Sequence, residues 1–452
     1  MINRKTPPAP KGNISFTIPE IKLLRSLKGT EVYFVGKDKL PIVQLIIMFS
    51  SGSKFDPSDK TGLAYLTSMM IDEGAGKYDS LQLNNEFEKL GSMINISADH
   101  DFFSFSLLSL KENFSRSFKL LSYIINEPWF DEKDFSREKK KMLDRILQLK
   151  DEPSFIASSA FEKQVFGSEF YAFPEIGFDN TVANISVDDI KGFYKNVLLN
   201  SEIKLVAVGN IDENELLKLI DEYLPRSINS LILPQFSQPI RSKTKFCFIN
   251  KPDSAQSEIR IGHISKSRAS EDFYSTRLMN TILGGQFSSR INLNLREQKG
   301  FTYGAYSSFN YFQKAGYFDV STAVDIQNTA EAVSEILTEL NSIRVNISKK
   351  EIDFAKSYLI KQFPSKFETY IQIARNIVPL IEHSLPLDYY QNYTDNLRHV
   401  TEDEIHKAAL NNIYPEDLIV LIVGDKEIIE PQLKTIANGN LCELDLCGNI
   451  RK

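Results

Sequence analysis

The segment Thr61–Gly74, which reads TGLAYLTSMMIDEG, has a residue spacing that could support metal chemistry if it formed a helix. Tyr65, Ser68 and Met69 fall at positions i, i+3 and i+4, so they would share one helix face. Metal-binding helices place their ligands at that spacing. Here the face holds a phenol, a hydroxyl and a thioether, which are not the nitrogen, thiolate or carboxylate ligands of zinc. The other face is apolar, so an ordinary buried helix is the alternative.

The histidines do not form a metal site elsewhere in the chain. No two of the five lie three or four residues apart, so none makes a helical ligand pair; they are His100, His263, His383, His399 and His406. His100 lies between Asp99 and Asp101, but in a strand its side chain would point away from both acids. We therefore expect a half-exposed strand histidine there. No serine, cysteine or aspartate neighbours a histidine in a recognisable nucleophile motif.

The composition is typical of a globular protein with a large core, since 42% of the 452 residues are hydrophobic and 25% are charged. The net charge of −6 argues against a nucleic-acid partner. The most apolar run, PIVQLIIMF, is too short to span a bilayer. The N-terminal stretch MINRKTPPAPKGNISF has no apolar signal region, which favours the cytoplasm, or the periplasm if a leader has been removed.

The three cysteines do not predict a disulfide framework, because their number is small and odd. Cys442 and Cys447 are close enough in sequence to pair, but they lie in a C-terminal segment that we expect to be loosely structured. Free thiols are the simpler interpretation for these two and for Cys247. The role of Cys442 and Cys447 stays open at this point.

The elements that must position any site are arranged in two similar halves. The strings IKLVAVGNIDENELLKLIDEYL and DLIVLIVGDKEIIEPQLKTIA share one plan: an apolar strand, a Val-Gly turn at Gly209 or Gly424, an acidic start and an amphipathic helix. Each half also contains a pair of alternating strands rich in aromatic and β-branched residues. Capping boxes, such as those of Ser348 with Glu351 and Thr401 with Glu404, mark helix starts in the second half.

The boundaries follow from this duplication. We predict a first half over residues 1–223, which contains the metal-helix region, and a second half over 244–440. Residues 224–243 contain three prolines and read as an extended linker, and 441–452 read as a tail. Antiparallel strand pairs with helices grouped on one side predict an α+β fold with one antiparallel sheet in each half.

This duplicated plan, together with three local strings, resembles the pitrilysin/insulinase family of zinc peptidases, the inverzincins. The most specific string is LGGQFSSRINLNLREQKGFTYGAYSSF, over Leu283–Phe309, and the others are TGLAYL and FSREKKKMLDRILQLKDEP. The resemblance covers nearly the whole chain. It implies two homologous halves of the metallopeptidase-roll type that together form a clamshell.

The resemblance also identifies which metal positions have changed. Active members carry H-x-x-E-H, in which two histidines bind zinc and the glutamate is the general base, and a distal glutamate completes the site. At the matching positions this chain has Tyr65 and Met69 for the histidines, Ser68 for the base and Arg145, seven residues after Glu138, for the distal ligand. We therefore expect a degenerate zinc site and no metal in this chain.

One part of the family's chemistry is retained in the second half. Arg296 and Tyr303 stand at the matching positions of REQKGFTY, where the family's arginine and tyrosine reach toward substrate at the zinc. Their expected role is to stabilise negative charge on the carbonyl oxygen during peptide cleavage. Gly284, Gly285 and Gly300 are expected in turns that allow close approach of backbones.

Loss of the metal ligands with retention of the arginine and tyrosine resembles the non-catalytic subunit of a two-chain family member, related to the mitochondrial processing peptidase subunits. The resemblance implies a heterodimer with a related zinc-binding peptidase subunit, with Arg296 and Tyr303 acting in trans. Zinc is then expected in the partner, and this chain alone is expected to be inactive. The implied substrate is a peptide or an unfolded polypeptide, bound as an added strand.

Two other functions remain open. The chain could be a structural subunit without peptidase activity, as some metal-free relatives are in respiratory complexes. It could also be a stand-alone clamshell that captures extended peptides without cutting them. The retained Arg296 and Tyr303 weigh against a purely structural subunit, because a scaffold has no use for a pair of oxyanion donors.

Overall fold

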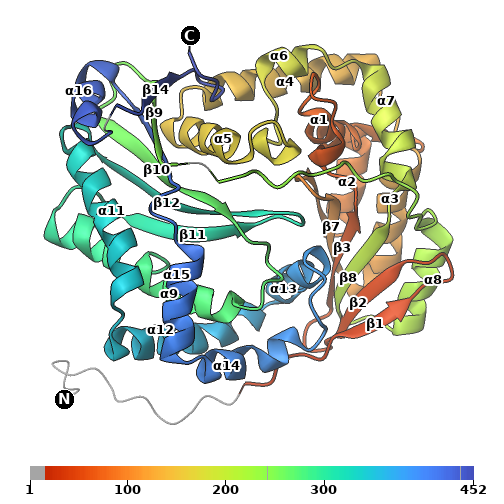
Figure 1. Ribbon diagram of the computed structural model, residues 1–452. Helices are drawn as coiled ribbons and strands as arrows, with labels where there is room; N and C mark the ends of the chain where they lie inside the picture. The colour runs from red at the N-terminus through yellow and green to blue at the C-terminus, as the bar shows by residue number, and fades with distance from the viewer. Residues whose placement is uncertain (1–15, 242, 438, 452) are drawn as a thin grey trace, which may run out of the picture.

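The computed structural model describes residues 16–241, 243–437 and 439–451, and it contains two six-stranded sheets, one in each half (Figure 1). Most of the segment on which the expectation about a leader rests, residues 1–15, lies outside the described residues. Within the described ranges, no helix combines the length and the apolar character needed to cross a bilayer.

The first half contains one sheet with strand order β1-β2-β8-β3-β7-β6 and the helices around it. Its elements are β1 (Lys22–Arg25), β2 (Glu31–Gly36), β3 (Ile42–Phe49), α1 (Leu63–Met70), β4 (Gly74–Ala75), β5 (Tyr78–Asp79), α2 (Ser80–Lys89), β6 (Met93–Ala98), β7 (Phe103–Leu110), α3 (Phe114–Asn126), α4 (Glu132–Leu149), α5 (Pro153–Phe166), α6 (Asp179–Ala183), α7 (Val187–Asn196), β8 (Ile203–Gly209) and α8 (Glu213–Tyr223).

The second half repeats this architecture around a sheet with order β11-β12-β10-β13-β9-β14. Its elements are β9 (Lys245–Asn250), β10 (Gln256–Ser265), α9 (Phe273–Leu283), α10 (Arg290–Asn292), a π-helical turn (Leu293–Gln298), β11 (Ala305–Tyr311), β12 (Gly316–Asp325), α11 (Thr329–Val345), α12 (Lys349–Gln362), α13 (Tyr370–Glu382), α14 (Tyr389–His399), α15 (Glu402–Asn412), β13 (Ile419–Gly424), α16 (Lys426–Ile436) and β14 (Leu441–Leu444).

The α+β class with two like halves is confirmed, and the sheets are mixed where purely antiparallel sheets were expected. β8 pairs in parallel with β2, and its counterpart β13 pairs in parallel with β9. The other long pairs, such as β3 with β7 and β10 with β12, are antiparallel. The parallel pairs arise because β8 and β13 each return, after several helices, beside an early strand of their half and in the same direction.

The local signals in the second half are also confirmed at the helix starts, and one expectation is wrong at the C-terminus. Ser348 with Glu351 and Thr401 with Glu404 form capping boxes at α12 and α15. The C-terminal segment is not loosely structured, because Leu441–Leu444 forms β14 and pairs in parallel with β9. Burial of Leu444 in the core explains why this short strand is held on the sheet.

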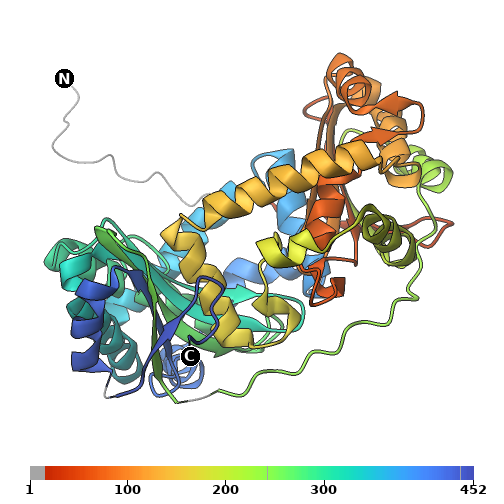
Figure 2. The same ribbon diagram turned by 90° about the horizontal axis from the view of Figure 1, so that it is seen from above.

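Each sheet is covered on one face by a helix that belongs to the other half in sequence. α5 packs on β10 and β13 of the second sheet, whereas α13 packs on β8 and β3 of the first sheet. The two halves are therefore interlocked by exchanged helices, in addition to the linker. Residues 224–241 contain no helix or strand and run as a long green trace along one side of the molecule (Figure 2).

The tip of the hairpin formed by β11 and β12 inserts into the first half and makes a buried polar contact there. Lys54 and Asp101 form an ion pair with 3.1 Å between Nζ and Oδ1, and their side chains are 5% and 8% exposed. Gln313 from the hairpin tip donates its backbone N–H to Asp101 and accepts a hydrogen bond from Lys54. The Tyr171 hydroxyl also donates to Asp101. We call Lys54, Asp101, Tyr171 and Gln313 the clasp.

Candidate functional site

Helix α1, which carries the degenerate metal positions, is fixed at its N-terminus by a carboxylate and a glycine. The Asp56 side chain accepts hydrogen bonds from the backbone N–H groups of Gly62 and Ala64, at 2.9 and 3.0 Å. Gly62 has φ +99°, and a Cβ there would lie 2.8 Å from the carbonyl oxygen of Ile176. Only glycine fits this close approach, so the position and direction of α1 are strongly determined.

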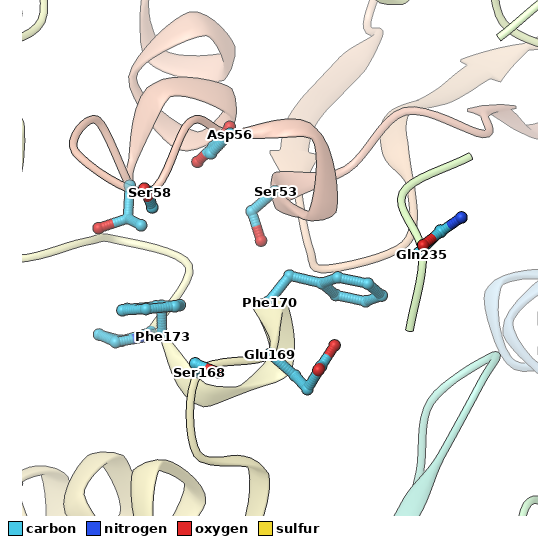
Figure 3. Close-up of a pocket in the computed structure, with 10 residues that line it drawn as sticks. Ser53, Asp56, Ser58, Ser168, Glu169, Phe170, Phe173 and Gln235 are labelled. Carbon is cyan, nitrogen blue, oxygen red and sulfur yellow. The ribbon is translucent and has the colours of Figure 1, made fainter. Parts of the chain in front are cut away.

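A cavity of about 210 Å³ lies in front of this turn (Figure 3). Ser53 and Asp56 face it from the first half, Phe170 and Phe173 close the opposite side, and Gln235 reaches it from the linker (Figure 3). Among the described residues that line it there is no histidine, lysine, arginine or cysteine. The histidine that contacts Ser53, His100, is not among these lining residues, and we assign the cavity no chemistry.

On α1 itself, the residues that replace the zinc ligands are used for packing. The Ser68 hydroxyl donates to the backbone carbonyl of Tyr65, at 2.7 Å, and Ser68 is buried. Met69 and the ring of Tyr65 are partly buried and pack against the core of the first half. This face supplies no zinc ligand of the imidazole, thiolate or carboxylate kind.

The distal position on α4 likewise has its charge paired within the chain. Arg145 is half-exposed, and its guanidinium lies 3.0 Å from the carboxylate of Glu152. Glu138, two helical turns earlier, is buried, and its carboxylate forms ion pairs with Arg137 at 2.9 Å and Lys141 at 2.5 Å. A cation at the distal position would repel a divalent metal ion, so these residues do not fit zinc.

The degenerate positions open onto a larger cavity of about 500 Å³ between the two halves. Tyr65 and Arg145 line it from α1 and α4, and Ser159, Glu162 and Tyr317 line it from α5 and β12. The Tyr317 hydroxyl donates to Glu162 at 2.9 Å, and burial raises the pKa of that carboxyl to about 7. The hydroxyl of Ser159 is buried and has no hydrogen-bond partner in the described part of the chain.

His100 lines the same cavity but is not the half-exposed strand histidine that the sequence suggested. It is 5% exposed, in the turn between β6 and β7, with the rings of Tyr171 and Phe312 packed edge-on against it. Its Nδ1 lies 3.1 Å from the hydroxyl of Ser53, and burial lowers its pKa to about 4. The expectation failed because Phe312 comes from the hairpin of the other half, a contact that local sequence does not reveal.

In the ranges that the structure describes, no group of three or more His, Cys, Asp or Glu side chains is placed so that it could hold a metal ion. The acids beside His100 have other partners. Asp99 accepts the backbone N–H groups of Asp101 and Phe102, both at 2.7 Å, and Asp101 belongs to the clasp.

Arg296 and Tyr303, the residues retained in the second half, lie in a very different environment. Arg296 is in the π-helical turn Leu293–Gln298, with its guanidinium carbon 4.3 Å from the ring centroid of Phe287. Tyr303 lies in the loop before β11 and is 93% exposed. Neither side chain makes a hydrogen bond to another of the described residues, although Glu297 lies 3.7 Å from Arg296.

The backbone around these two side chains is nevertheless firmly held. The Asn292 side chain accepts the backbone N–H of Ala305 at 3.0 Å, which ties the start of the segment to its end. Phe301 donates its N–H to the carbonyl of Leu295 at 2.9 Å. Lys299 pairs with two carboxylates on α11, at 2.9 and 2.8 Å. The segment 292–305 therefore presents Arg296 and Tyr303 from a fixed frame.

The glycines of this region have the roles that the sequence predicted. A Cβ on Gly284 would lie 2.5 Å from the backbone nitrogen of Ser307, and one on Gly285 would lie 2.9 Å from the carbonyl oxygen of Asn280. Gly300 has φ +69°, a conformation that glycine adopts without strain. The expectation of close backbone approach is confirmed at Gly284 and Gly285, and that of a turn at Gly300.

The structure keeps the two sets of predicted residues apart. Tyr65 and Arg145 meet at the cavity, whereas Arg296 and Tyr303 are not among the described residues that line it. The sequence did not single out Ser159, which α5 carries into that cavity. No local pattern could have indicated it, because α5 reaches the second sheet only through the exchange of helices.

Comparisons with known proteins agree with this architecture. The sequence profile of the insulinase family (peptidase family M16) matches residues 34–172. The profile described as the peptidase M16 inactive domain matches residues 184–359. Together the two profiles cover most of both halves.

Individual relatives are distant but match over most of the chain. A Helicobacter pylori protein named as a non-peptidase homologue, YmxG, is 22% identical over 396 residues, which cover 86% of this chain and 90% of that protein. A Bacillus subtilis protein named as an uncharacterised zinc protease, also YmxG, is 20% identical over 346 residues, which cover 75% and 82%. The crystal structure of a peptidase M16 inactive domain from Pseudomonas fluorescens superimposes with a TM-score of 0.82 at 24% identity, covering 90% of this chain and 98% of that one.

Proposed function

The chain belongs to the insulinase family of peptidases, peptidase family M16, and we propose that it acts as the metal-free subunit of a two-chain zinc peptidase. In this proposal, zinc and its activated water belong to a related partner chain that carries H-x-x-E-H. This chain contributes Arg296 and Tyr303 to the partner's site. The substrate is a peptide or an unfolded polypeptide.

The observation that supports the proposal most directly is the state of these two side chains. Arg296 and Tyr303 project from a backbone held by Asn292 and Ala305, yet they form no hydrogen bond to the described residues of their own chain. The replaced ligand positions have the opposite character, as Ser68 and Arg145 are bonded internally. Donors that are fixed in place and unused within the chain are suited to a substrate held by another molecule.

The chemistry of peptide cleavage explains why an arginine and a tyrosine would be useful. Cleavage of a peptide bond builds negative charge on its carbonyl oxygen, which becomes an oxyanion, and zinc in the partner chain would supply an activated water for the attack. The Arg296 guanidinium carries a permanent charge and a planar set of N–H donors, and the Tyr303 hydroxyl can donate one more hydrogen bond. Both groups would bind the oxyanion more strongly than the neutral carbonyl, which lowers the barrier to reaction.

The first sheet offers a place for an extended substrate. β6 is the last strand in the order β1-β2-β8-β3-β7-β6, so one of its edges has no neighbouring strand in that sheet. Its residues alternate between exposed and half-buried, and β6 runs beside α1. An extended peptide can add to such an edge through main-chain hydrogen bonds with little dependence on sequence.

The proposal is tested by reconstituting the pair. The chain is co-expressed with a related protein that contains H-x-x-E-H, and the zinc content and the cleavage of a fluorogenic unfolded peptide are measured for the pair and for each chain alone. We expect zinc in the partner only, no cleavage by this chain alone, and cleavage by the pair that a chelator abolishes. Stoichiometric zinc in this chain, or cleavage by the purified lone chain, would contradict the proposal.

A second candidate function is peptide capture without cleavage, which the open edge of β6 and the adjacent cavity favour. In that case the chain alone would bind an unfolded, fluorescently labelled peptide, and replacement of Arg296 would leave the affinity unchanged. The main-chain contacts at β6 would then be sufficient for the function.

A further inference from the structure

Two cysteines from distant parts of the sequence lie beside each other on neighbouring strands. Cys247 is in β9 and Cys442 is in β14, and the parallel register of these strands pairs Cys442 with Cys247 and Leu444 with Ile249. Residues paired in this way point to the same face of the sheet, because side chains alternate along each strand. The two Sγ atoms lie 2.8 Å apart.

The surroundings make one sulfur buried and the other accessible. Cys247 is fully buried in the core between the second sheet and α5, whereas Cys442 is partly exposed at the edge of that core. β14 is the last strand in the order of its sheet, and although residues 449–451 fold back against Glu443 and Leu444, Cys442 stays partly exposed to a reagent. Adjacent strands lie at a spacing that suits a disulfide, whose two Cα atoms are about 4.4–6.8 Å apart.

We propose that Cys247 and Cys442 form an intramolecular disulfide when the protein meets a small-molecule disulfide such as oxidised glutathione, and that this bond staples the C-terminal strand to the second sheet. The step is a thiol–disulfide exchange, so the oxidant is the small-molecule disulfide itself. Nothing in the zinc chemistry described above is needed for it.

The exchange balances in two displacements. The Cys442 thiolate attacks one sulfur of the small-molecule disulfide, whose S–S bond breaks and releases one thiol, leaving a mixed disulfide on Cys442. Cys247 then loses its proton and attacks the Cys442 sulfur, and the second small thiol leaves with its sulfur protonated. Two protein thiols are oxidised, and one small-molecule disulfide is reduced to two thiols.

The order of these displacements follows from the electrostatics of the pair. The hydrogen bond with Cys247, followed by the positive charge of Lys245, lowers the pKa of the Cys442 thiol to about 7. The hydrogen bond to Cys442 and burial both raise the pKa of Cys247. Cys442 is thus the more readily ionised and more exposed thiol, which suits the first attack.

The third cysteine provides an internal control. Cys447 lies in the turn that follows β14, where its backbone N–H donates to the Asp445 side chain at 2.9 Å. Burial raises the pKa of its thiol, with Asp445 adding to the effect. Cys447 therefore lacks the register and the facing sulfur that bring Cys442 to Cys247.

The disulfide would restrain the C-terminal segment that follows β14, which connects the edge of the sheet with α5. Gln164 of α5 donates to the carbonyl of Gly448 at 2.6 Å and accepts from Lys245 of β9 at 2.8 Å. The backbone of Gly448 lies against Ala160. A covalent bond between β9 and β14 would therefore keep the C-terminal segment in place against α5, one wall of the larger cavity.

The test is to incubate the folded full-length protein with excess oxidised glutathione, alkylate it after unfolding, and count the modified cysteines by intact mass. We expect the wild-type chain to retain one alkylatable cysteine out of three, with peptide mapping showing the Cys247–Cys442 cross-link. Cys447→Ser should form the same bond and retain none. Oxidation should raise Tm by about 4 °C in both proteins.

Cys442→Ser and Cys247→Ser should each form no intramolecular bond and show no rise in Tm on oxidation. Because Cys247 is buried, its variant could be unstable, and the exposed Cys442→Ser variant keeps the comparison valid without it. Three alkylatable cysteines in the oxidised wild-type protein, or a cross-link that contains Cys447, would overturn the proposal.

Discussion

The helix pair α1–α4 and the segment 292–305 differ in how their polar side chains are used. In the helix pair, Ser68 donates to the backbone of its own helix and Arg145 is paired with Glu152. In the segment, neither Arg296 nor Tyr303 makes a hydrogen bond to another described residue, and the nearest carboxylate to Arg296 is that of Glu297 at 3.7 Å, although the backbone that carries both side chains is well held. The two side chains of the helix pair are thus bonded within the chain. Arg296 and Tyr303, in the segment 292–305 that we call the outward-facing region, have no hydrogen-bond partner among the described residues.

This difference shows which feature of a site is informative. Exposure alone means little, because polar side chains on surfaces are satisfied by water at small cost. An exposed donor on a fixed backbone is different, since its position is determined before any ligand arrives. Arg296 is stacked on Phe287, is 32% exposed and has Glu297 no closer than 3.7 Å, whereas Arg145 is 50% exposed but is closely paired with Glu152 at 3.0 Å.

The largest expected effect comes from rebuilding the lost metal site. The variant with Tyr65→His, Ser68→Glu, Met69→His and Arg145→Glu should bind about one zinc ion per chain, whereas the wild-type chain should bind none. Tyr65 and Arg145 already line the same cavity, so the restored side chains would converge there. Zinc is measured by elemental analysis after dialysis.

The matched control retains the arginine at position 145. A variant with the three helix substitutions but with Arg145 unchanged should bind zinc poorly, because a guanidinium would replace the last ligand and repel the ion. A four-residue variant that folds normally, as judged by circular dichroism, yet takes up no zinc would show that α1 and α4 no longer have ligand geometry.

The second prediction concerns the clasp, which holds the two regions in one frame. Asp101→Asn should lower the free energy of unfolding by about 3–5 kcal/mol, because the buried Lys54 ammonium loses its counter-charge. The hydrogen bonds from Tyr171 and from the backbone of Gln313 would remain possible, so the loss reports mainly on the charge. Urea denaturation measures it.

Asp151→Asn is the control for this effect. Asp151 also joins the two halves through an ion pair, with Lys251 at 2.6 Å, but its side chain is 81% exposed. An exposed pair contributes less than about 1 kcal/mol, so this variant should unfold almost like the wild-type protein. If both variants lose the same free energy of unfolding, the buried ion pair of the clasp contributes no more to stability than an exposed one.

Much of the architecture could be predicted because both halves repeat the same local sequence patterns. The strand–glycine–helix endings at Gly209 and Gly424 correctly indicated β8 with α8 and β13 with α16. The exchange of α5 and α13 could not be predicted, because it depends on contacts between segments far apart in sequence. β14 was missed for a similar reason, as its four residues form a strand only beside β9.

For the candidate site, the sequence was informative only where the identity of a residue decides whether it can bind a metal ion. The absence of zinc ligands at Tyr65 and Met69 is visible in the sequence, and the described structure places no substitute ligand set nearby. The burial of His100 beneath Phe312, by contrast, was unpredictable, because the covering ring comes from the other half. The role of Arg296 stays a prediction.

The third prediction tests the outward-facing region directly. In the reconstituted pair, Arg296→Ala should reduce kcat by about 10²–10³-fold, and Tyr303→Phe by about tenfold, because both donors act on charge that develops in the transition state. KM should change little, since the ground-state carbonyl interacts weakly with these groups. Steady-state cleavage of the fluorogenic peptide gives both constants.

Tyr306→Phe is the matched control. Tyr306 is also exposed, at 48%, and lies just beyond Tyr303 at the start of β11. Its loss of a hydroxyl should leave kcat unchanged. If Tyr303→Phe and Tyr306→Phe behave alike, and Arg296→Ala retains normal turnover while the pair still assembles, the outward-facing region has no part in the reaction.

The smallest expected effect is a pH dependence at the cavity beside the degenerate site. Burial raises the pKa of Glu162 from 4.5 to about 7, even though Tyr317 donates a hydrogen bond to it and Arg260 lies near. Glu175 adds to the increase, as does Asp319. A carboxyl with a raised pKa contributes stability that is complete below its unfolded value and is lost as the pH rises through about 7.

Glu162→Gln should remove that loss, because the amide keeps an oxygen for Tyr317 and never ionises. The variant should therefore be more stable than the wild-type protein by about 2 kcal/mol at pH 8, and equal to it within error at pH 4. Urea denaturation at both pH values measures the difference. Glu152→Gln, whose side chain is 46% exposed, is the matched control for the same substitution at the surface. If the stability difference between Glu162→Gln and the wild-type protein does not change with pH, the Glu162 carboxyl titrates as it does in water. The cavity beside the degenerate metal positions would then be open to solvent, and the contrast with the segment that carries Arg296 would be weaker.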